Sequence, residues 1–189
     1  TGSSIKAEAE YVTKLLTELE QMRNMHYLKT AEIQAVFLGG GTPGTLTKEQ
    51  LSSILQKVRQ VLPLSSDCEI TVESSIYDMT KRNLLLASKM VQTDLAWGAN
   101  FCYGLRRQLG RPDTCEEVVR KLKLFAATGT KVIIDLIYGL SGQTKELLQR
   151  DLQFYLDCGL SGVDLYKLQI FPGTRWAINL KLIRVISLQ

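Results

Sequence analysis

The sequence predicts an α/β protein: a partial, open TIM-type barrel of βα repeats, in which helices cover parallel strands. The first observation is a series of short apolar runs that begin near residues 33, 68, 94, 131 and 162. The second is that helical patterns separate these runs, and such crossovers join parallel neighbours. The third is length, because a complete eight-stranded barrel needs about 250 residues and this chain has 189. We therefore expect an incomplete barrel, which could lack a strand before its first helix.

The first half of the chain alternates helix and strand. A helix is expected over residues 6–28, where apolar side chains recur at helical spacing. A strand over residues 33–38 follows, because this run is short, rich in branched and aromatic residues, and ended by glycine. The next helix opens with a capping box, with Thr47 as N-cap and Gln50 three residues later. Residues 68–73 then alternate polar and apolar side chains, as a half-exposed strand does.

The second half repeats the alternation. Its expected elements are a helix at 80–90, a weak strand at 93–98, a loop at 109–113, a helix that Gly129 ends, a strand at 131–139, a helix at 144–157 and a strand at 163–170. The strand at 131–139 is the clearest, because branched apolar residues dominate it. No linker divides the repeats, so we expect one domain over residues 1–175 and leave residues 176–189 unassigned.

Composition and charge exclude several classes of function. Hydrophobic residues make up 45% of the chain and charged residues 22%, as in ordinary globular proteins. The net charge of +4 is mild and no basic cluster stands out, so nucleic acid is not an expected partner. No apolar run has membrane-spanning length and the first residues do not have a signal-peptide pattern, so we expect a cytoplasmic protein without a membrane partner.

The cysteines and the histidine do not indicate a metal centre. The cysteines are scattered without metal or redox spacing, at Cys68, Cys102, Cys115 and Cys158. We expect reduced thiols and no metal ligand within the chain. His26 is the only histidine and lies near the end of a helical pattern, where an exposed side chain is expected rather than a catalytic one.

A glycine-rich stretch follows the first strand and invites a ligand. Gly39, Gly40 and Gly41 lack Cβ atoms, so a ligand can approach the backbone closely there, or φ can become positive. One alternative is a plain tight turn. Another is the dinucleotide fingerprint Gly-x-Gly-x-x-Gly, which would indicate an NAD-dependent oxidoreductase. That fingerprint needs a helix that opens inside the glycines, and Pro43 interrupts this stretch before Gly44.

Polar residues lie toward the carboxyl ends of the other predicted strands. Because ligands bind at the carboxyl ends of parallel strands, we expect Gly40, Glu73, Asp135 and Tyr166 to converge on one rim. Asp135 is the most telling of these, since apolar neighbours surround it in sequence and a carboxylate there is costly without a partner. A salt bridge or helix cap is the alternative role for Asp135, and an ordinary surface carboxylate is the alternative for Glu73.

Four blocks of sequence carry a resemblance to a known family. They are Phe37 to Pro43, Glu69 to Glu73, Leu109 to Arg111, and Asp135 to Thr144. In order and spacing they resemble the radical S-adenosylmethionine enzymes related to oxygen-independent coproporphyrinogen III oxidase, over about residues 31–175. Residues 69–73 and 164–166, followed by 171–173, most resemble the anaerobic heme-utilisation branch. Members of that branch are associated with heme degradation by radical methyl transfer.

The resemblance implies a radical enzyme acting on a tetrapyrrole, by heme degradation or coproporphyrinogen III oxidation, with a reductant protein as electron donor. It implies S-adenosylmethionine as a cofactor, bound by Gly40, Gly41, Thr42, Glu73, Asn100, Arg111, Asp135, Ile137 and Lys167. The glycines and Thr42 would meet the methionyl amino group, and Arg111 would face the methionyl carboxylate. Catalytic residues are not assigned.

The remaining implied roles concern the nucleoside part of the cofactor. Glu73 and Asp135 would accept hydrogen bonds from the sugar hydroxyls or the amino group, and Ile137 and Lys167 would border the adenine. Asn100 stands where the family has a glutamine, in a block one residue shorter, and Ser141 replaces a proline.

The resemblance also implies a 4Fe–4S cluster. In this family three cysteines in a Cys-x3-Cys-x2-Cys loop hold the cluster, and we expect them upstream of Thr1. Without a cluster, radical chemistry cannot start. A heme-binding chaperone on the same fold is the alternative function.

Overall fold

The computed structural model describes residues 2–76, 78, 95–98, 103–111, 113–172 and 174. The chain divides into two compact units, residues 1–95 and 96–189, which are described separately. The expected helix at 80–90, Asn100, Cys102 and the segment 176–189 lie outside the described residues.

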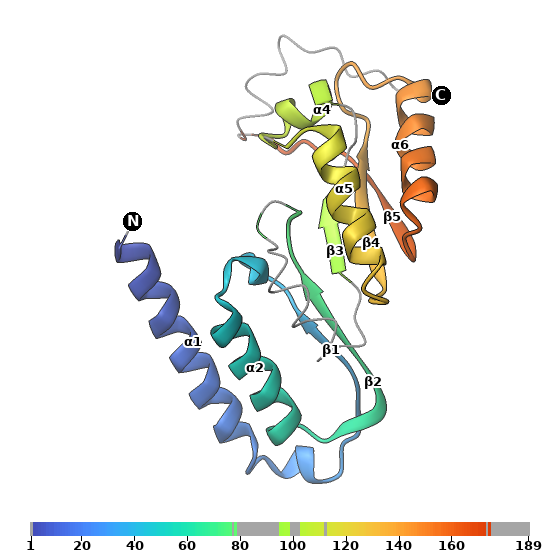
Figure 1. The fold of residues 1–189 in the computed structure, drawn as a ribbon. Helices are drawn as coiled ribbons and strands as arrows, with labels where there is room; N and C mark the ends of the chain where they lie inside the picture. The colour runs from blue at the N-terminus through green and yellow to red at the C-terminus, as the bar shows by residue number, and fades with distance from the viewer. Residues whose placement is uncertain are drawn as a thin grey trace. The chain divides into compact units, whose positions relative to one another are not determined.

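The first unit contains two helices and a pair of parallel strands (Figure 1). Its elements are α1 (Gly2–Met22), the 3₁₀ helix η1 (His26–Lys29), β1 (Ile33–Leu38), the 3₁₀ helix η2 (Pro43–Thr45), α2 (Lys48–Val61) and β2 (Leu64–Glu73). The predicted strand at 33–38 and the capping box of α2 are confirmed: the Gln50 amide donates to the Thr47 hydroxyl at 3.2 Å, and the Thr47 amide donates to the Gln50 side chain at 2.7 Å.

Two boundaries in this unit differ from the prediction. The first helix ends at Met22 rather than near residue 28, because tight bonds such as the Met25 amide to the Met22 carbonyl (2.9 Å) replace the α-helical pattern. β2 begins at Leu64, earlier than the predicted residue 68. Its register against β1 shifts between Ile33 and Ala35, so the first residues of β2 do not alternate regularly.

The two faces of the β1–β2 pair differ. Val36 and Leu38 on β1 pack with the core side chains of α1 and α2, and Ile70 and Val72 on β2 are buried. The intervening residues point to the other side because side chains alternate along a strand. We call this side the open face of the first unit; it carries Phe37, Thr71 and Glu73.

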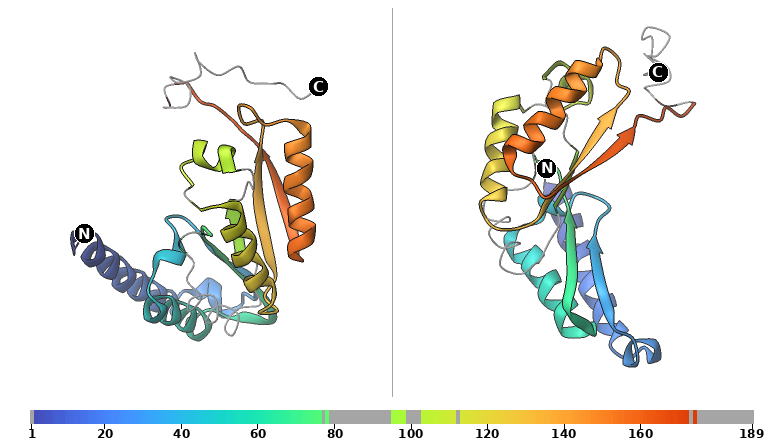
Figure 2. Two further views of the ribbon diagram at one scale, coloured as in Figure 1. Left: turned by 45° about the horizontal axis from the view of Figure 1, so that its top comes forward. Right: turned by 90° about the vertical axis from the view of Figure 1, so that its right-hand side faces the viewer.

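The second unit repeats the architecture of the first. Its elements are β3 (Leu95–Gly98, which spans the boundary), α4 (Tyr103–Gln108), α5 (Cys115–Ala126), β4 (Val132–Tyr138), α6 (Lys145–Cys158) and β5 (Gly162–Lys167). β4 and β5 are parallel and in continuous register from Ile133–Gly162 to Tyr138–Lys167. Figure 2 shows α5 and α6 beside the β4–β5 pair.

Side-chain caps begin two helices of the second unit, and α6 ends at the predicted glycine. α5 starts with a second capping box, formed by Thr114 and Glu117, and Thr144 caps α6. Gly159 ends α6 in the left-handed conformation, with φ of 68°. The short helix α4 was not predicted, because six residues are too few for an apolar stripe to be recognised.

The core of this unit lies between its helices and β4. Val118, Leu122 and Phe125 of α5 are fully buried, as are alternate residues of β4, including Ile134 and Leu136. No helix among the described residues is long and apolar enough to cross a membrane.

Candidate cofactor-binding site

The glycine loop that follows β1 leaves its backbone accessible. Gly40 has a φ of 97°, a value that residues with a side chain rarely adopt. A Cβ atom added to Gly40 or Gly41 would meet no atom within 4 Å, so the space beside both residues is open. The loop therefore has the shape of a cradle in which a ligand can reach main-chain amide and carbonyl groups.

Gly39 has a different reason to be glycine. A Cβ atom at this position would lie 2.5 Å from Cε1 of Phe37 and 2.8 Å from Oε2 of Glu73. The register of the strands explains the contact, because Leu38 pairs with Val72, and Gly39 and Glu73 each come next along the chain. The absence of a side chain at residue 39 thus lets the Glu73 carboxylate lie against the loop backbone.

Thr42 presents its hydroxyl rather than its carbonyl. The Thr42 carbonyl already accepts hydrogen bonds from the Thr45 amide (2.9 Å) and the Thr45 hydroxyl (2.8 Å). A carbonyl oxygen has two lone pairs, so little capacity remains for a ligand. The Thr42 side chain makes no capping bond to η2.

The geometry after the glycines does not fit the dinucleotide fingerprint. η2 follows Thr42 directly, and α2 begins only at Lys48, beyond Gly44. The helix N-terminus therefore does not open within the glycines, where a pyrophosphate would need it. The NAD alternative loses its structural basis.

A groove of about 620 Å³ in the first unit is lined by residues of α1, β1 and α2, together with Gly39, Gly41 and Thr42. Its walls are mainly apolar side chains, including Leu15, Leu19 and Val58. Such walls do not match a charged methionyl group. The glycine loop borders this groove, and we expect a charged ligand at the end of the loop beside Glu73 rather than among the apolar side chains.

In the second unit, Asp135 lies within β4 and not at its end. It is the fourth residue of Val132–Tyr138, so its expected place at the strand terminus is wrong. Its neighbours Ile134 and Leu136 are fully buried, whereas Asp135 is half-buried on the opposite face. Its register partner on β5 is Asp164, so both carboxylates project from the same face. Sequence reasoning missed this pairing because it depends on the strand register.

The ends of β4 and β5 place an aromatic residue next to Ile137. Ile137 pairs with Tyr166, and Tyr138 pairs with Lys167. Because side chains alternate along a strand, Tyr166 shares the face of Asp135 and Ile137. We call this the open face of the second unit. Lys167 is the last residue of β5, and its side chain projects from the opposite face. Its role beside an adenine stays a prediction.

Gln143 holds the turn that follows β4. Its side chain is 2% exposed, and Oε1 accepts hydrogen bonds from the amides of Gly139 (2.8 Å) and Leu140 (3.3 Å). Nε2 donates to the Ile137 carbonyl at 3.5 Å. Gly139 has a φ of 85°, which suits glycine. The turn that fixes the end of β4, and with it Ile137, is therefore organised by one buried amide.

Arg111 is exposed in the loop between α4 and α5. Its amide donates to the Arg106 carbonyl at 2.9 Å. Within the part of the chain that the structure describes, its guanidinium has no hydrogen bond or ion pair and is accessible to an anion. Gly110 turns the chain just before it with a φ of 70°.

The predicted site residues therefore form local groups. In the first unit, the glycine loop and Glu73 are adjacent. In the second, Asp135 and Ile137 share the open face. The convergence of these groups on one rim stays a prediction, as does the role of Asn100.

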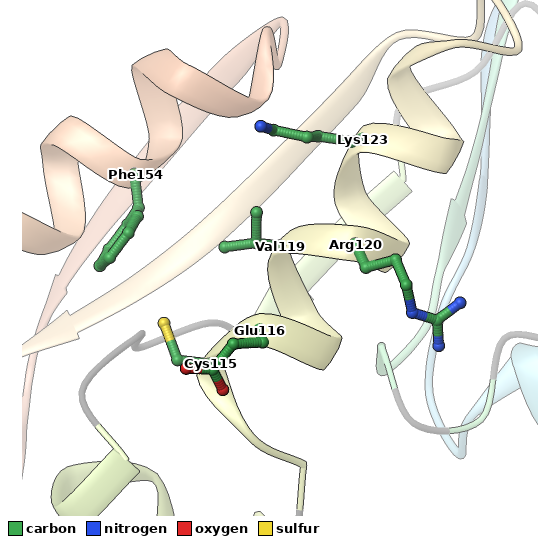
Figure 3. Close-up of a pocket in the computed structure, with 6 residues that line it drawn as sticks. All are labelled: Cys115, Glu116, Val119, Arg120, Lys123 and Phe154. Carbon is green, nitrogen blue, oxygen red and sulfur yellow. The ribbon is translucent and has the colours of Figure 1, made fainter.

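A second pocket, of about 470 Å³, lies on the helical side of the second unit (Figure 3). Phe154 of α6 points toward Cys115 and Val119 of α5, and Arg120 and Lys123 also line the pocket. All of these residues come from helices and none from the open face. This pocket is therefore separate from the candidate cofactor site.

The described residues offer no metal centre. Among them, no three His, Cys, Asp or Glu side chains are grouped closely enough to hold a metal ion. The described cysteines, Cys68, Cys115 and Cys158, form no disulfide bond. Burial raises the pKa of the Cys68 and Cys158 thiols, which disfavours the thiolate form that binds metals.

Several curated proteins are similar in sequence to this chain. Anaerobilin synthase of Escherichia coli O157:H7 is 31% identical over 175 residues, which cover 88% of this chain and 38% of that protein. The heme chaperone HemW of Escherichia coli K12 is 29% identical over 167 residues, covering 87% of this chain and 44% of that protein. Oxygen-independent coproporphyrinogen III oxidase of Helicobacter pylori is 31% identical over 149 residues, covering 77% of this chain and 32% of that protein. The chain thus spans less than half the length of each of these relatives.

Solved structures show the same fold. The structure of coproporphyrinogen III oxidase from Escherichia coli, described as a radical SAM enzyme, matches with a TM-score of 0.73 and 24% identity. The match covers 86% of this chain and 38% of that protein. No family model matches the sequence. The α/β fold with parallel strands is confirmed, and the chain is homologous to proteins named anaerobilin synthase, heme chaperone HemW and oxygen-independent coproporphyrinogen III oxidase, the group that its motifs resemble.

Proposed function

We propose that this chain is the cofactor-holding part of a radical S-adenosylmethionine enzyme that acts on a tetrapyrrole. The observation that carries the proposal is the cradle formed by Gly40 and Gly41, open on one side and bordered by the Glu73 carboxylate. The names of the relatives supply the substrate class, since anaerobilin synthase and coproporphyrinogen III oxidase both act in tetrapyrrole chemistry.

The residues present fit S-adenosylmethionine. The open backbone at Gly40 and Gly41 and the free Thr42 hydroxyl suit a methionyl ammonium, which donates to carbonyl and hydroxyl oxygens. The exposed guanidinium of Arg111 suits the methionyl carboxylate. Glu73 and Asp135 are carboxylate acceptors for hydroxyl groups. When bound, the cofactor supplies radical or methyl-transfer chemistry, and these residues bind and orient it.

The open face of the second unit suits the nucleoside. Asp135 and its register partner Asp164 form a polar step, and Ile137 and Tyr166 form an apolar and aromatic step two residues further along. Steps two residues apart on a strand are separated by about 6.6 Å, which is comparable to the distance from a sugar to the far side of its purine. We assign the sugar to the first step and the adenine to the second.

The 4Fe–4S cluster does not fit the described residues. Their cysteines are scattered, and two of the thiols are shifted toward the protonated form. We therefore assign no cluster ligand to them. Residues 1–189, reconstituted anaerobically with iron and sulfide, should hold no cluster. Stoichiometric iron with the broad absorbance of a 4Fe–4S centre would contradict this assignment.

The partial-barrel architecture belongs to the same proposal. In each unit, helices cover one face of a parallel pair, and a proposed ligand carboxylate, Glu73 or Asp135, lies on the other face. A barrel wall has this arrangement, with its ligands at the carboxyl ends of the strands. We propose that residues 1–175 form one barrel domain. We also propose that the protein is cytoplasmic and receives electrons from a reductant protein.

The full-length protein, loaded with its cofactors under anaerobic conditions, tests the function. With a chemical reductant and either heme or coproporphyrinogen III, we expect consumption of S-adenosylmethionine and a modified tetrapyrrole, both followed by chromatography and mass spectrometry. Glu73→Gln is the matched variant, because it keeps the shape of the side chain and removes its charge. Equal turnover by this variant and the natural protein would contradict the role of Glu73.

A heme chaperone is the second candidate, because proteins named heme chaperone HemW are 28% and 29% identical to this chain. Stoichiometric heme binding without turnover of S-adenosylmethionine would favour it. Turnover that depends on the tetrapyrrole would favour the enzyme.

A further inference from the structure

The loop that carries Arg111 is closed by one buried residue. Arg106 of α4 is 2% exposed, although arginine is rarely buried without a partner. Its carbonyl accepts hydrogen bonds from the amides of Leu109 (3.1 Å) and Arg111 (2.9 Å). Its guanidinium reaches the far side of the loop, where Nε donates to the Asp113 carbonyl at 3.1 Å. Main chain and side chain of a single residue thus hold both ends of the loop.

An ion pair completes this closure. The terminal guanidinium nitrogen of Arg106 lies 3.5 Å from Oδ2 of Asp113, and Lys121 of α5 lies 3.5 Å from Oδ1 of the same carboxylate. Burial lowers the pKa of Arg106, the Asp113 carboxylate opposes that shift, and the nearby charge of Arg111 adds to it. Arg106 is therefore buried beneath this loop, Lys121 is partly buried beside Asp113, and Arg111 is exposed to solvent.

We propose that Arg106 and Asp113 are positioning residues that fix the loop backbone so that Arg111 presents its guanidinium to the carboxylate of S-adenosylmethionine. This inference rests on the proposed function and deepens it. Because an arginine side chain is long and loses conformational freedom on binding, a loop of fixed geometry lowers the cost of placing its guanidinium. The closure acts on affinity for one part of the ligand, its carboxylate, and not on the nucleoside.

The test compares two ligands that differ only in that carboxylate. Decarboxylated S-adenosylmethionine keeps the sulfonium, the amine and the nucleoside but has no group for Arg111. In the full-length protein, loaded with its 4Fe–4S cluster but free of S-adenosylmethionine, Asp113→Asn should weaken binding of S-adenosylmethionine about ten-fold, a change equal to about 1.4 kcal/mol. Binding of the decarboxylated ligand should weaken by less than about two-fold. The ratio of the dissociation constant of the decarboxylated ligand to that of S-adenosylmethionine should therefore fall.

A second variant guards against loss of folding. Asp113→Asn leaves the buried charge of Arg106 without its full partner, which is often strongly destabilising. Arg106→Lys keeps a cation for Asp113, but a lysine lacks the fork of donors that reaches the Asp113 carbonyl. The Arg106→Lys variant should therefore lower the same ratio of dissociation constants while the protein stays folded. Lys121→Met is the matched control, because it removes the other ion pair on Asp113 and leaves the closure of the loop intact.

Calorimetric titration with each ligand, beside a thermal melt of each variant, separates the outcomes. A ratio that falls in Arg106→Lys and Asp113→Asn, and is unchanged in Lys121→Met, supports the inference. Equal weakening of both ligands, or no weakening of either, in folded variants would overturn it. Arg111→Met tests the assignment of Arg111 to the carboxylate of S-adenosylmethionine. An unchanged ratio in that variant would overturn the proposed site itself, and so would a natural protein that binds neither ligand.

Discussion

The contact between Gly39 and Glu73 gives the sharpest test of the candidate site. In Gly39→Ala, the new methyl group would lie 2.8 Å from Oε2 of Glu73 and 2.5 Å from Cε1 of Phe37, both closer than van der Waals contact. Phe37 is 64% exposed and can swing into solvent, and the Glu73 carboxylate can also move. The overpacking cost should therefore fall below the 1–3 kcal/mol typical of a closed core.

The effect on the ligand should be larger than the effect on folding. If Glu73 binds S-adenosylmethionine as proposed, a displaced carboxylate would lose a charge-assisted hydrogen bond, which is worth about 1.5–3 kcal/mol. Affinity should then fall by about 10- to 100-fold, at about 1.4 kcal/mol per decade. If this loss acts through the carboxylate, Gly39→Ala should cost little further affinity in a Glu73→Ala background, because neighbouring sites couple.

The assay is a double-mutant cycle in which S-adenosylmethionine is titrated calorimetrically into the full-length, cluster-loaded protein. A thermal melt of each variant accompanies it. Strictly additive losses of affinity from Gly39→Ala and Glu73→Ala would refute the reasoning. So would a Gly39→Ala protein that binds as tightly as the natural one.

Three further predictions concern folding and the second unit. Asp135→Ala should weaken S-adenosylmethionine binding by about 10- to 100-fold with little change in melting temperature; the opposite pattern, in titration beside a melt, would indicate a structural role. Gln143→Leu should lower the free energy of unfolding by about 1–3 kcal/mol for each amide left unpaired, measured by denaturant titration, and unchanged stability would contradict the bonding described. Hydrogen bonds from Arg23, and then Lys57, lower the pKa of Glu20 from its ordinary 4.5 to about 2. A lowered pKa stabilises the fold above pH 4.5 and that contribution fades as pH falls toward 2, so the melting temperatures of the natural protein and Glu20→Gln should converge over that range, and a constant difference would contradict the pairing.

Local signals in the sequence were enough to locate most elements. A strand that ends in glycine, a hydroxyl residue three positions before a glutamine, and a glycine after a helix each act within a few residues. The strand at 33–38, the Thr47 cap of α2 and the Gly159 end of α6 were therefore found correctly. The glycine loop was also identified from sequence, because the lack of Cβ atoms is a property of the residues themselves.

Contacts between distant segments could not be read in this way. The pairing of Asp135 with Asp164, and of Ile137 with Tyr166, depends on the register of two strands separated by a helix. The early start of β2 depends on an irregular register with β1. Alternation along one strand does not reveal the register of its partner, because a shift of one residue reverses every face.

The closure of the Arg111 loop shows the same division. The sequence by itself determined that Arg111 lies in a loop that leads to a helix and that its motif resembles a family of cofactor-binding proteins. Only the tertiary structure revealed that Arg106 is buried and bonded to Asp113. An arginine in a short helix is ordinarily an exposed charge, and the cost of burying it is offset here by partners whose positions depend on how the loop folds back.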